Sequence, residues 1–152
     1  MVSLHHRVLI QSKWNTYAQP NTMIILYCVM VLLACSSTSV HASADPQRIA
    51  ADLRKLAMLA LPHGIRVAFE ALSWGRHINE YPRSWEVVGM ADCPNLGFGI
   101  DSYHIFATDT ALDRLQDIDP ARIYLVQLSA FTWQQTRSVQ ERIDTARDFR
   151  VS

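Results

Sequence analysis

The sequence contains few cysteines and no motif built from them. The only three are Cys28, Cys35 and Cys93, and no two of them have the C-x-x-C spacing. An odd number without that spacing argues against a structural zinc site and against a disulfide framework. We therefore expect free thiols that are buried or partly buried, as in proteins of a reducing compartment.

An excess of charge of either sign is also missing. The chain has 14 basic and 14 acidic residues, and its basic residues form no stripe with interleaved aromatic residues. Such a stripe is typical of proteins that bind nucleic acid, so we expect no nucleic-acid partner. Low-complexity tracts and internal repeats are absent. The 152 residues fit at most one domain, and the 49% apolar content suffices for a packed core.

The apolar run at 23–34 (MIILYCVMVLLA) has only 12 residues, too few to span a bilayer as a helix. The Ala-Ser-Ala sequence at 42–44 resembles a signal-peptidase site, so residues 23–44 fit a secretory signal. The run also fits a buried parallel strand within 23–35, because such strands are near-continuous apolar segments. The pattern alone leaves both interpretations open.

Strands and helices are expected to alternate after this run. A helix should begin at Asp45-Pro46, because aspartate caps helices and proline suits the first helical position, and Pro62 should end it. A second helix should begin at Pro82. Three apolar runs are expected to form strands: Ile65–Leu72, Leu96–Asp101 and Ile123–Leu128.

The segment between the last two strands is expected to contain little regular structure. We predict a loop at Ser102–Asp109 and a short helix at Thr110–Gln116, capped by Asp109. The resulting order is β-α-β-α-β-α-β. With right-handed crossovers, this order predicts an α/β fold with parallel strands and helices outside the sheet.

The two ends of the chain carry weaker signals. Residues 1–22 show no clear period and are expected to be irregular or disordered. Residues 132–152 form a divergent tail that is expected to hold one more helix. Ser138 and Glu141 have the spacing of a capping box, which supports that helix.

Three of the expected strands end in an oxygen-bearing side chain. Asp101 follows Glu70 by 31 residues, and Gln127 follows Asp101 by 26, about one strand-plus-helix unit. Successive strand ends lie side by side at the face where α/β barrels keep their chemistry. The three side chains would thus meet at one hard divalent metal ion. The structural alternatives are a salt-bridged Glu70, an Asx turn at Asp101 and a backbone contact at Gln127.

The motifs around these residues resemble those of the xylose-isomerase-like TIM-barrel superfamily, which includes sugar-phosphate isomerases and epimerases. Within it they are most similar to the 3-dehydroshikimate dehydratase family, including the form fused to a 4-hydroxyphenylpyruvate dioxygenase-like domain. The motifs are VAFEALSWGRH at 67–77, LGFGIDSYHI at 96–105 and RIYLVQL at 122–128. The upstream segments VLLACSSTS and IAADLRKLAMLALPHGI resemble the family's fourth βα unit.

The resemblance favours the strand interpretation of the apolar run. It implies a partial TIM barrel at 23–131, with about four βα units that correspond to strands four to seven. It also implies a cytoplasmic protein without membrane contact, with a secreted protein carrying a signal at 23–44 as the alternative.

The resemblance implies roles for individual residues. Arg76 and His77 match the loop that shapes the substrate pocket, and His104 matches a catalytic histidine that reaches the substrate. The ligands of strands five, six and seven correspond to Glu70, Asp101 and Gln127.

The implied activity is that of a metal-dependent lyase. It would convert 3-dehydroshikimate to protocatechuate through an enolate stabilised by a divalent metal, Mg²⁺ or Mn²⁺. The substrate would then be a cyclic hydroxy-keto acid. A sugar-phosphate isomerase or epimerase is the alternative, because the same scaffold supports both reactions.

The chain departs from the family pattern in three ways. Strands one to three have no counterpart, the acidic continuation after Ser129 is replaced by Ala130–Trp133, and the strand-eight glutamate is absent. A closed barrel needs at least about 200 residues. We therefore expect a fragment of such an enzyme, or a non-catalytic remnant that self-associates through open barrel edges.

Overall fold

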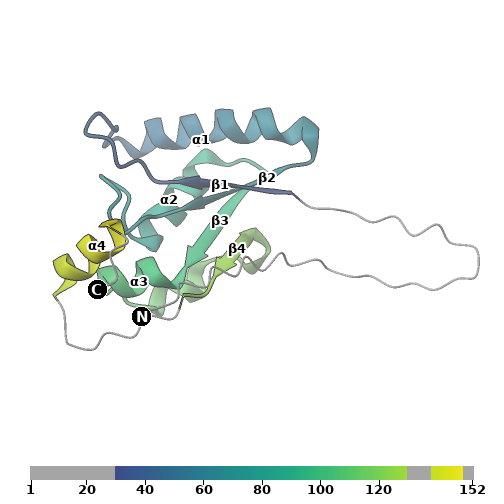
Figure 1. Ribbon diagram of the computed structural model, residues 1–152. Coiled ribbons are helices and arrows are strands. Elements are labelled where there is room, and N and C mark those ends of the chain that lie inside the picture. The colour runs from purple at the N-terminus through teal and green to yellow at the C-terminus, as the bar shows by residue number, and fades with distance from the viewer. Residues whose placement is uncertain (1–29, 130–137, 149–152) are drawn as a thin grey trace, which may run out of the picture.

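The computed structural model describes residues 30–129 and 138–148, in which strands and helices alternate (Figure 1). The strands are β1 (Val31–Cys35), β2 (Arg66–Glu70), β3 (Leu96–Asp101) and β4 (Ile123–Gln127). The α-helices are α1 (Pro46–Ala60), α2 (Tyr81–Ala91), α3 (Ser102–Thr108) and α4 (Val139–Asp148). Short 3₁₀ helices are η1 (Leu61–His63), η2 (Asp113–Asp117) and η3 (Pro120–Arg122). The predicted N-terminal segment 1–22 lies outside the described residues.

The four strands form one parallel sheet in the order β1-β2-β3-β4. The predicted α/β class with four parallel strands is therefore confirmed. Because the strands are parallel and neighbours in sequence are neighbours in space, all four carboxyl ends lie at one edge of the sheet. That edge positions the candidate site.

Local sequence signals explain where α1 begins and ends. The Asp45 carboxylate accepts a hydrogen bond of 2.9 Å from the N–H of Gln47, and Pro46 occupies the first helical position, as predicted. After α1 and the 3₁₀ helix η1, Gly64 adopts a φ of 67°, a left-handed conformation that glycine tolerates without strain. The chain then turns directly into β2.

The hydrophobic core lies between the sheet and the helices α1 and α2, which lie on the same side of it in Figure 1. Alternate residues of the central strands enter this core, as the two-residue period of a strand requires. The strand residues buried there or in the adjoining smaller cluster are Val67, Phe69, Leu96 and Phe98. This layer fixes the direction in which the opposite face of each strand points.

The strand β1 forms one edge of the described sheet. The side chains of Val31, Leu32 and Leu33 are 37–42% exposed, so this strand is not the buried strand that the apolar run suggested, because it has a partner on one side only within the described sheet. Val31–Cys35 does form a strand, as the resemblance implied, and residues 23–29 of the run lie outside the described residues. In the ranges 30–129 and 138–148, no helix is long and apolar enough to cross a bilayer.

The predicted loop at Ser102–Asp109 is wrong, because this segment is helix α3. Asp101 caps it by accepting a bond of 2.8 Å from the N–H of Tyr103, and Ile105 is buried on its inner side. Asp109 ends this helix with a φ of 57° instead of beginning the next one. The predicted helix at Thr110–Gln116 is consequently reduced to the 3₁₀ helix η2.

The tail helix is present as α4. Its capping box is formed, since the Glu141 carboxylate accepts a bond of 2.8 Å from the N–H of Ser138. The Ser138 hydroxyl in turn accepts a bond of 3.3 Å from the N–H of Glu141. The helix packs beside α3, where Arg142 donates a bond of 2.9 Å to the carbonyl of Phe106 (Figure 1).

Candidate divalent-metal site

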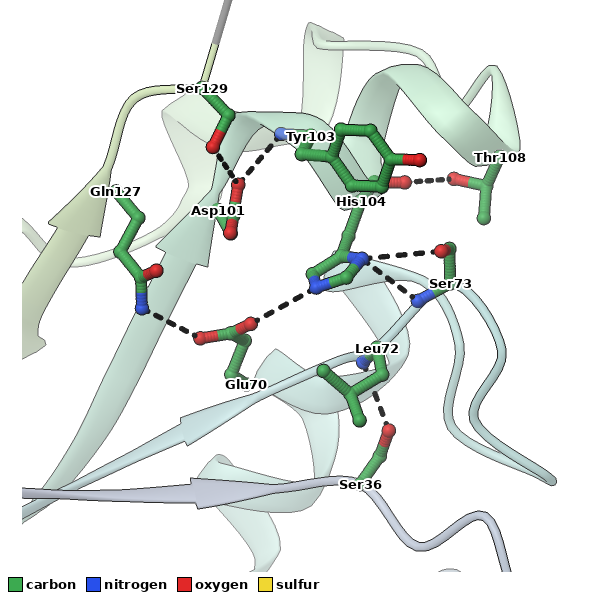
Figure 2. A network of polar contacts seen from close by, with 10 residues as sticks. All are labelled: Ser36, Glu70, Leu72, Ser73, Asp101, Tyr103, His104, Thr108, Gln127 and Ser129. Atoms are coloured by element: carbon green, nitrogen blue, oxygen red, sulfur yellow. Dashed lines mark hydrogen bonds and ion pairs between the residues drawn. The ribbon is translucent and has the colours of Figure 1, made fainter. Parts of the chain in front are cut away.

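The candidate site is built from the carboxyl ends of three neighbouring strands. Glu70, Asp101 and Gln127 are the last residues of β2, β3 and β4, and Asp101 is paired with Gln127 in the strand register. The sheet therefore brings together the three strand ends that the sequence spacing predicted. Figure 2 shows their side chains pointing toward a common region.

Glu70 is the most buried member of the group, at 3% exposed. One carboxylate oxygen lies 3.3 Å from Nε2 of His104, and the other accepts a bond of 3.4 Å from the amide nitrogen of Gln127 (Figure 2). Among the described residues, no lysine or arginine forms an ion pair with it. A buried carboxylate without a fixed positive partner favours binding of a cation.

Asp101 has a structural role as well as a place in the group. Its Oδ1 accepts the capping bond from Tyr103 and a second bond of 3.4 Å from the hydroxyl of Ser129. Both bonds end on the same oxygen. Capping of α3 therefore uses Oδ1 of Asp101. Its other carboxylate oxygen, Oδ2, can still act as a metal ligand.

His104 lies in the first turn of α3 and is 8% exposed. Its Nδ1 is 3.3 Å from the main-chain nitrogen of Ser73 and 3.2 Å from the Ser73 hydroxyl. The rings of Trp74 and Tyr103 meet the imidazole edge-on, with centroids at 4.9 and 5.5 Å. The imidazole is thus fixed between an acid, a serine and two aromatic rings.

Ser73 and Ser129 also belong to this network, although no sequence pattern predicted them. Ser73 follows Glu70 by three residues, so its place just beyond a strand end was the available signal. Ser129 holds a similar place after β4, where its N–H donates a bond of 2.9 Å to the Ser102 hydroxyl. Trp74, the residue after Ser73, packs against the site histidine itself.

The donor atoms of Glu70, Asp101 and His104 all lie within 4.8 Å of one another. Two carboxylates and an imidazole at this spacing fit one divalent cation. The amide nitrogen of Gln127 faces Glu70, so in the structure Gln127 is a hydrogen-bond donor to the cluster. The residues present therefore fit a divalent metal and do not select its identity.

Arg76 and His77 lie apart from this network. Both are exposed in the loop after β2, and the N–H of Arg76 donates a bond of 2.8 Å to the carbonyl of Ser37. The loop is thereby fastened to the segment that follows β1. Their contact with a substrate stays a prediction.

Cys35 extends the site toward the edge strand, because it pairs with Glu70 in the strand register. The residue is exposed, yet partial burial of its thiol and then the negative charge of Glu70 raise the pKa of Cys35 from 9.0 to about 11. A thiol with such a pKa is protonated at neutral pH, so it is a poor nucleophile there.

Comparison with known proteins places this geometry in context. The model of the xylose isomerase-like TIM barrel family matches residues 26–149. A 3-dehydroshikimate dehydratase from Pseudomonas aeruginosa is 36% identical over 99 residues, which are 65% of this chain and 16% of that protein. The chain therefore spans about a sixth of the length of this curated relative.

Two solved structures resemble the described fold. A xylose isomerase-like TIM barrel/4-hydroxyphenylpyruvate dioxygenase fusion protein aligns with a TM-score of 0.68 and 36% identity, covering 74% of this chain and 18% of that one. The IOLI protein, solved with a bound zinc atom, aligns with a TM-score of 0.60 and 17% identity, covering 82% and 51%. The second likeness concerns the fold alone. The four-stranded part of a (β/α)₈ barrel expected from the sequence is confirmed.

Proposed function

Because this chain belongs to the xylose isomerase-like TIM barrel family, we propose that it carries part of the active site of a divalent-metal-dependent lyase resembling 3-dehydroshikimate dehydratase. The observation that carries the proposal is the buried cluster of Glu70, Asp101 and His104. The 36% identity to the Pseudomonas aeruginosa relative supports the substrate class. The chain covers only 16% of that relative, so the activity of the complete enzyme is a proposal for this chain.

In the proposed site, Glu70 and Asp101 hold the metal through carboxylate oxygens. Gln127 is the third ligand and would present its amide oxygen. The IOLI protein, which shares the fold, was solved with a bound zinc atom, and this supports a divalent ion in the proposal. The oxygen-rich set favours Mg²⁺ or Mn²⁺. When bound, such an ion acts as a Lewis acid toward the ketone oxygen of the substrate.

The remaining residues would bind substrate and move a proton. His104 would exchange a proton with a substrate bound at the metal, and the position of its Nε2, 3.3 Å from a carboxylate oxygen of Glu70, supports this role. The flanking rings of Trp74 and Tyr103 restrict water around the imidazole. Arg76 and His77, in the loop that leaves the same sheet edge, would bind the substrate's carboxylate.

The test is conversion of 3-dehydroshikimate by the purified chain with Mn²⁺, followed through the absorbance of protocatechuate. We expect product from the wild type and at least a hundredfold loss in Glu70→Gln, because the buried ligand is removed. Glu80→Gln is the matched control, since Glu80 is exposed and its side chain makes no capping bond. Equal turnover by the wild type and Glu70→Gln would contradict the proposed role of Glu70.

A second candidate is a chain that does not catalyse but associates through its sheet edges. It is supported by the exposed apolar residues of β1 and by the open sides of β1 and β4 within the described sheet. Open parallel edges pair readily with other strands. Metal binding without turnover, with a concentration-dependent mass in light scattering, would favour this candidate. Turnover of a sugar phosphate in its place would favour an isomerase or epimerase.

A further inference from the structure

We propose that Ser73 is a positioning residue that fixes the tautomer of His104. In this proposal, the main-chain N–H of Ser73 holds Nδ1 as a hydrogen-bond acceptor, and the Ser73 hydroxyl, which can donate or accept, then donates to the same nitrogen. The imidazole proton is thereby kept on Nε2, facing Glu70. His104 then meets the proposed metal centre as a proton donor and not as a ligand, a consequence that rests on the proposed function.

The two contacts of the imidazole agree on one tautomer. A main-chain N–H can only donate, and that of Ser73 lies 3.3 Å from Nδ1, so Nδ1 must supply a lone pair. A neutral imidazole has one N–H, which is then on Nε2. Nε2 lies 3.3 Å from a carboxylate oxygen of Glu70, which can only accept when ionised.

The opposite tautomer would create two unfavourable contacts at once. The N–H on Nδ1 would face the N–H of Ser73, with only the Ser73 hydroxyl able to accept from it, and the Nε2 lone pair would face the Glu70 carboxylate. Both His104 and Glu70 are buried, so water does not relieve these contacts. The contacts of both ring nitrogens therefore favour the tautomer with the proton on Nε2.

The main chain of Ser73 is itself held in place. The N–H of Leu72 donates a bond of 3.0 Å to the hydroxyl of Ser36, and the N–H of Gly75 donates a bond of 2.7 Å to the carbonyl of Leu72. Figure 2 shows the first of these bonds, just below the contacts of Ser73 with His104. The donor that meets Nδ1 is thus part of a fixed turn at the end of β2.

This arrangement is the reverse of the one usual for a metal-binding histidine. Such a histidine coordinates through a lone pair on one nitrogen and donates its other N–H to an acceptor. In His104 the lone pair on Nδ1 faces a donor, and the nitrogen nearest the carboxylate carries the proton. The ligands in this part of the chain are then Glu70, Asp101 and Gln127, although the three closest donor groups include His104.

The direct test is a long-range ¹H–¹⁵N NMR spectrum of the ¹⁵N-histidine-labelled chain, recorded at about pH 8, where histidine is ordinarily neutral. The His104 signals are identified by their loss in His104→Gln. We expect a pyridine-type Nδ1 and a pyrrole-type Nε2, unchanged when Mg²⁺ is added. A pyrrole-type Nδ1, or loss of the Nε2 proton on adding Mg²⁺, would overturn the proposal.

The variant Ser73→Ala tests the hydroxyl separately. It keeps the main-chain N–H, and a hydroxyl can serve either tautomer, so we expect the same tautomer as in the wild type, with the proton on Nε2. Ser84→Ala is the matched control, because Ser84 is a fully buried serine in α2 whose hydroxyl has no hydrogen-bond partner among the described residues. A pyrrole-type Nδ1 in Ser73→Ala would show that the main-chain N–H does not fix the tautomer and would overturn the proposal.

The NMR readout is independent of substrate and turnover. Absence of dehydratase activity would count against the proposed function and leave the tautomer assignment standing. A reversed tautomer would overturn the role of Ser73 even in an active enzyme.

Discussion

The two faces of the sheet differ in what their residues do. On the face covered by α1 and α2, the central strands contribute large apolar side chains, among them Phe69 and Phe98, which are buried in the core. On the opposite face the same strands contribute small or polar residues, including Gly97 and Glu70. Along the central strands, alternate side chains thus pack in the core, and the side chains between them point to the face that carries the site.

This opposite face, which we call the open face, has small residues that allow strands and side chains to approach closely. A Cβ at Gly97 would lie 2.4 Å from the carbonyl of Arg122 and 2.5 Å from the ring of Tyr124. That ring also receives the guanidinium of Arg66 at 4.9 Å from its centroid. The face that carries the site is therefore tightly arranged at its base, although neither α1 nor α2 covers it.

The largest loss of stability is expected on the helix-covered face. Replacing Phe98 by alanine empties a fully buried position, so the free energy of unfolding should fall by about 3–5 kcal/mol. Urea unfolding followed by circular dichroism measures it. Leu59→Ala is the control, since Leu59 is 74% exposed and should change stability by less than about 0.5 kcal/mol. Similar losses in both variants would remove the distinction between core and surface.

A smaller loss is expected at the base of the open face. Gly97→Ala forces a Cβ into the Arg122 carbonyl and should lower the free energy of unfolding by about 1–3 kcal/mol. Gly89→Ala is the matched control, because a Cβ at Gly89 in α2 meets nothing within 4 Å. That change should stabilise the chain by about 0.5–1 kcal/mol, through the higher helix propensity of alanine. A neutral Gly97→Ala would show that the open face is not tightly arranged.

The electrostatics of the open face can be read from Cys35. With its pKa raised to about 11, alkylation of Cys35 by iodoacetamide should be slow at neutral pH and should accelerate as the pH rises toward 11. Glu70→Gln removes the second cause of the shift and should increase the rate at about pH 8 by less than tenfold, since desolvation remains. Peptide-resolved mass spectrometry separates Cys35 from the other cysteines. A rate unaffected by Glu70→Gln would show that the carboxylate does not act on this thiol.

The smallest effect is expected at Ser84 on the helix-covered face. Its buried hydroxyl has no hydrogen-bond partner in the described part of the chain, so Ser84→Ala removes an uncompensated polar group. The free energy of unfolding should rise by roughly 0–1 kcal/mol. A loss of more than about 1 kcal/mol in urea unfolding would indicate that this hydroxyl is satisfied in solution.

The alternation of the two faces explains how much of the molecule could be read from the sequence. The strand at Leu96–Asp101 has the bounds predicted, because its apolar period and the preceding Pro94 are local signals. The other two strands were also predicted, but β2 ends at Glu70 instead of Leu72 and β4 at Gln127 instead of Leu128, because the apolar runs continue past the paired residues. The spacing of one βα unit nevertheless grouped Glu70, Asp101 and Gln127 at one sheet edge.

Contacts between distant segments could not be predicted in the same way. The bond from Ser73 to His104 joins residues 31 positions apart and depends on the turn after β2, for which no single residue is diagnostic. Helix α3 was missed because Asp101 was interpreted as a strand end and metal ligand, with an Asx turn as the alternative, whereas one of its oxygens also caps the helix. The sequence pattern around Asp101 thus indicated its place at a strand end but not its role as a helix cap.

The most direct test of the metal site on the open face is the effect of Mn²⁺ on thermal unfolding of the wild type and Glu70→Gln. At a free concentration of one hundred times the dissociation constant, a ligand specific to the folded state adds about 2.7 kcal/mol. We therefore expect Mn²⁺ to raise the Tm of the wild type and of Glu80→Gln by several degrees, and to leave Glu70→Gln nearly unchanged. An equal rise in Tm for the wild type and Glu70→Gln would contradict a metal site anchored on Glu70.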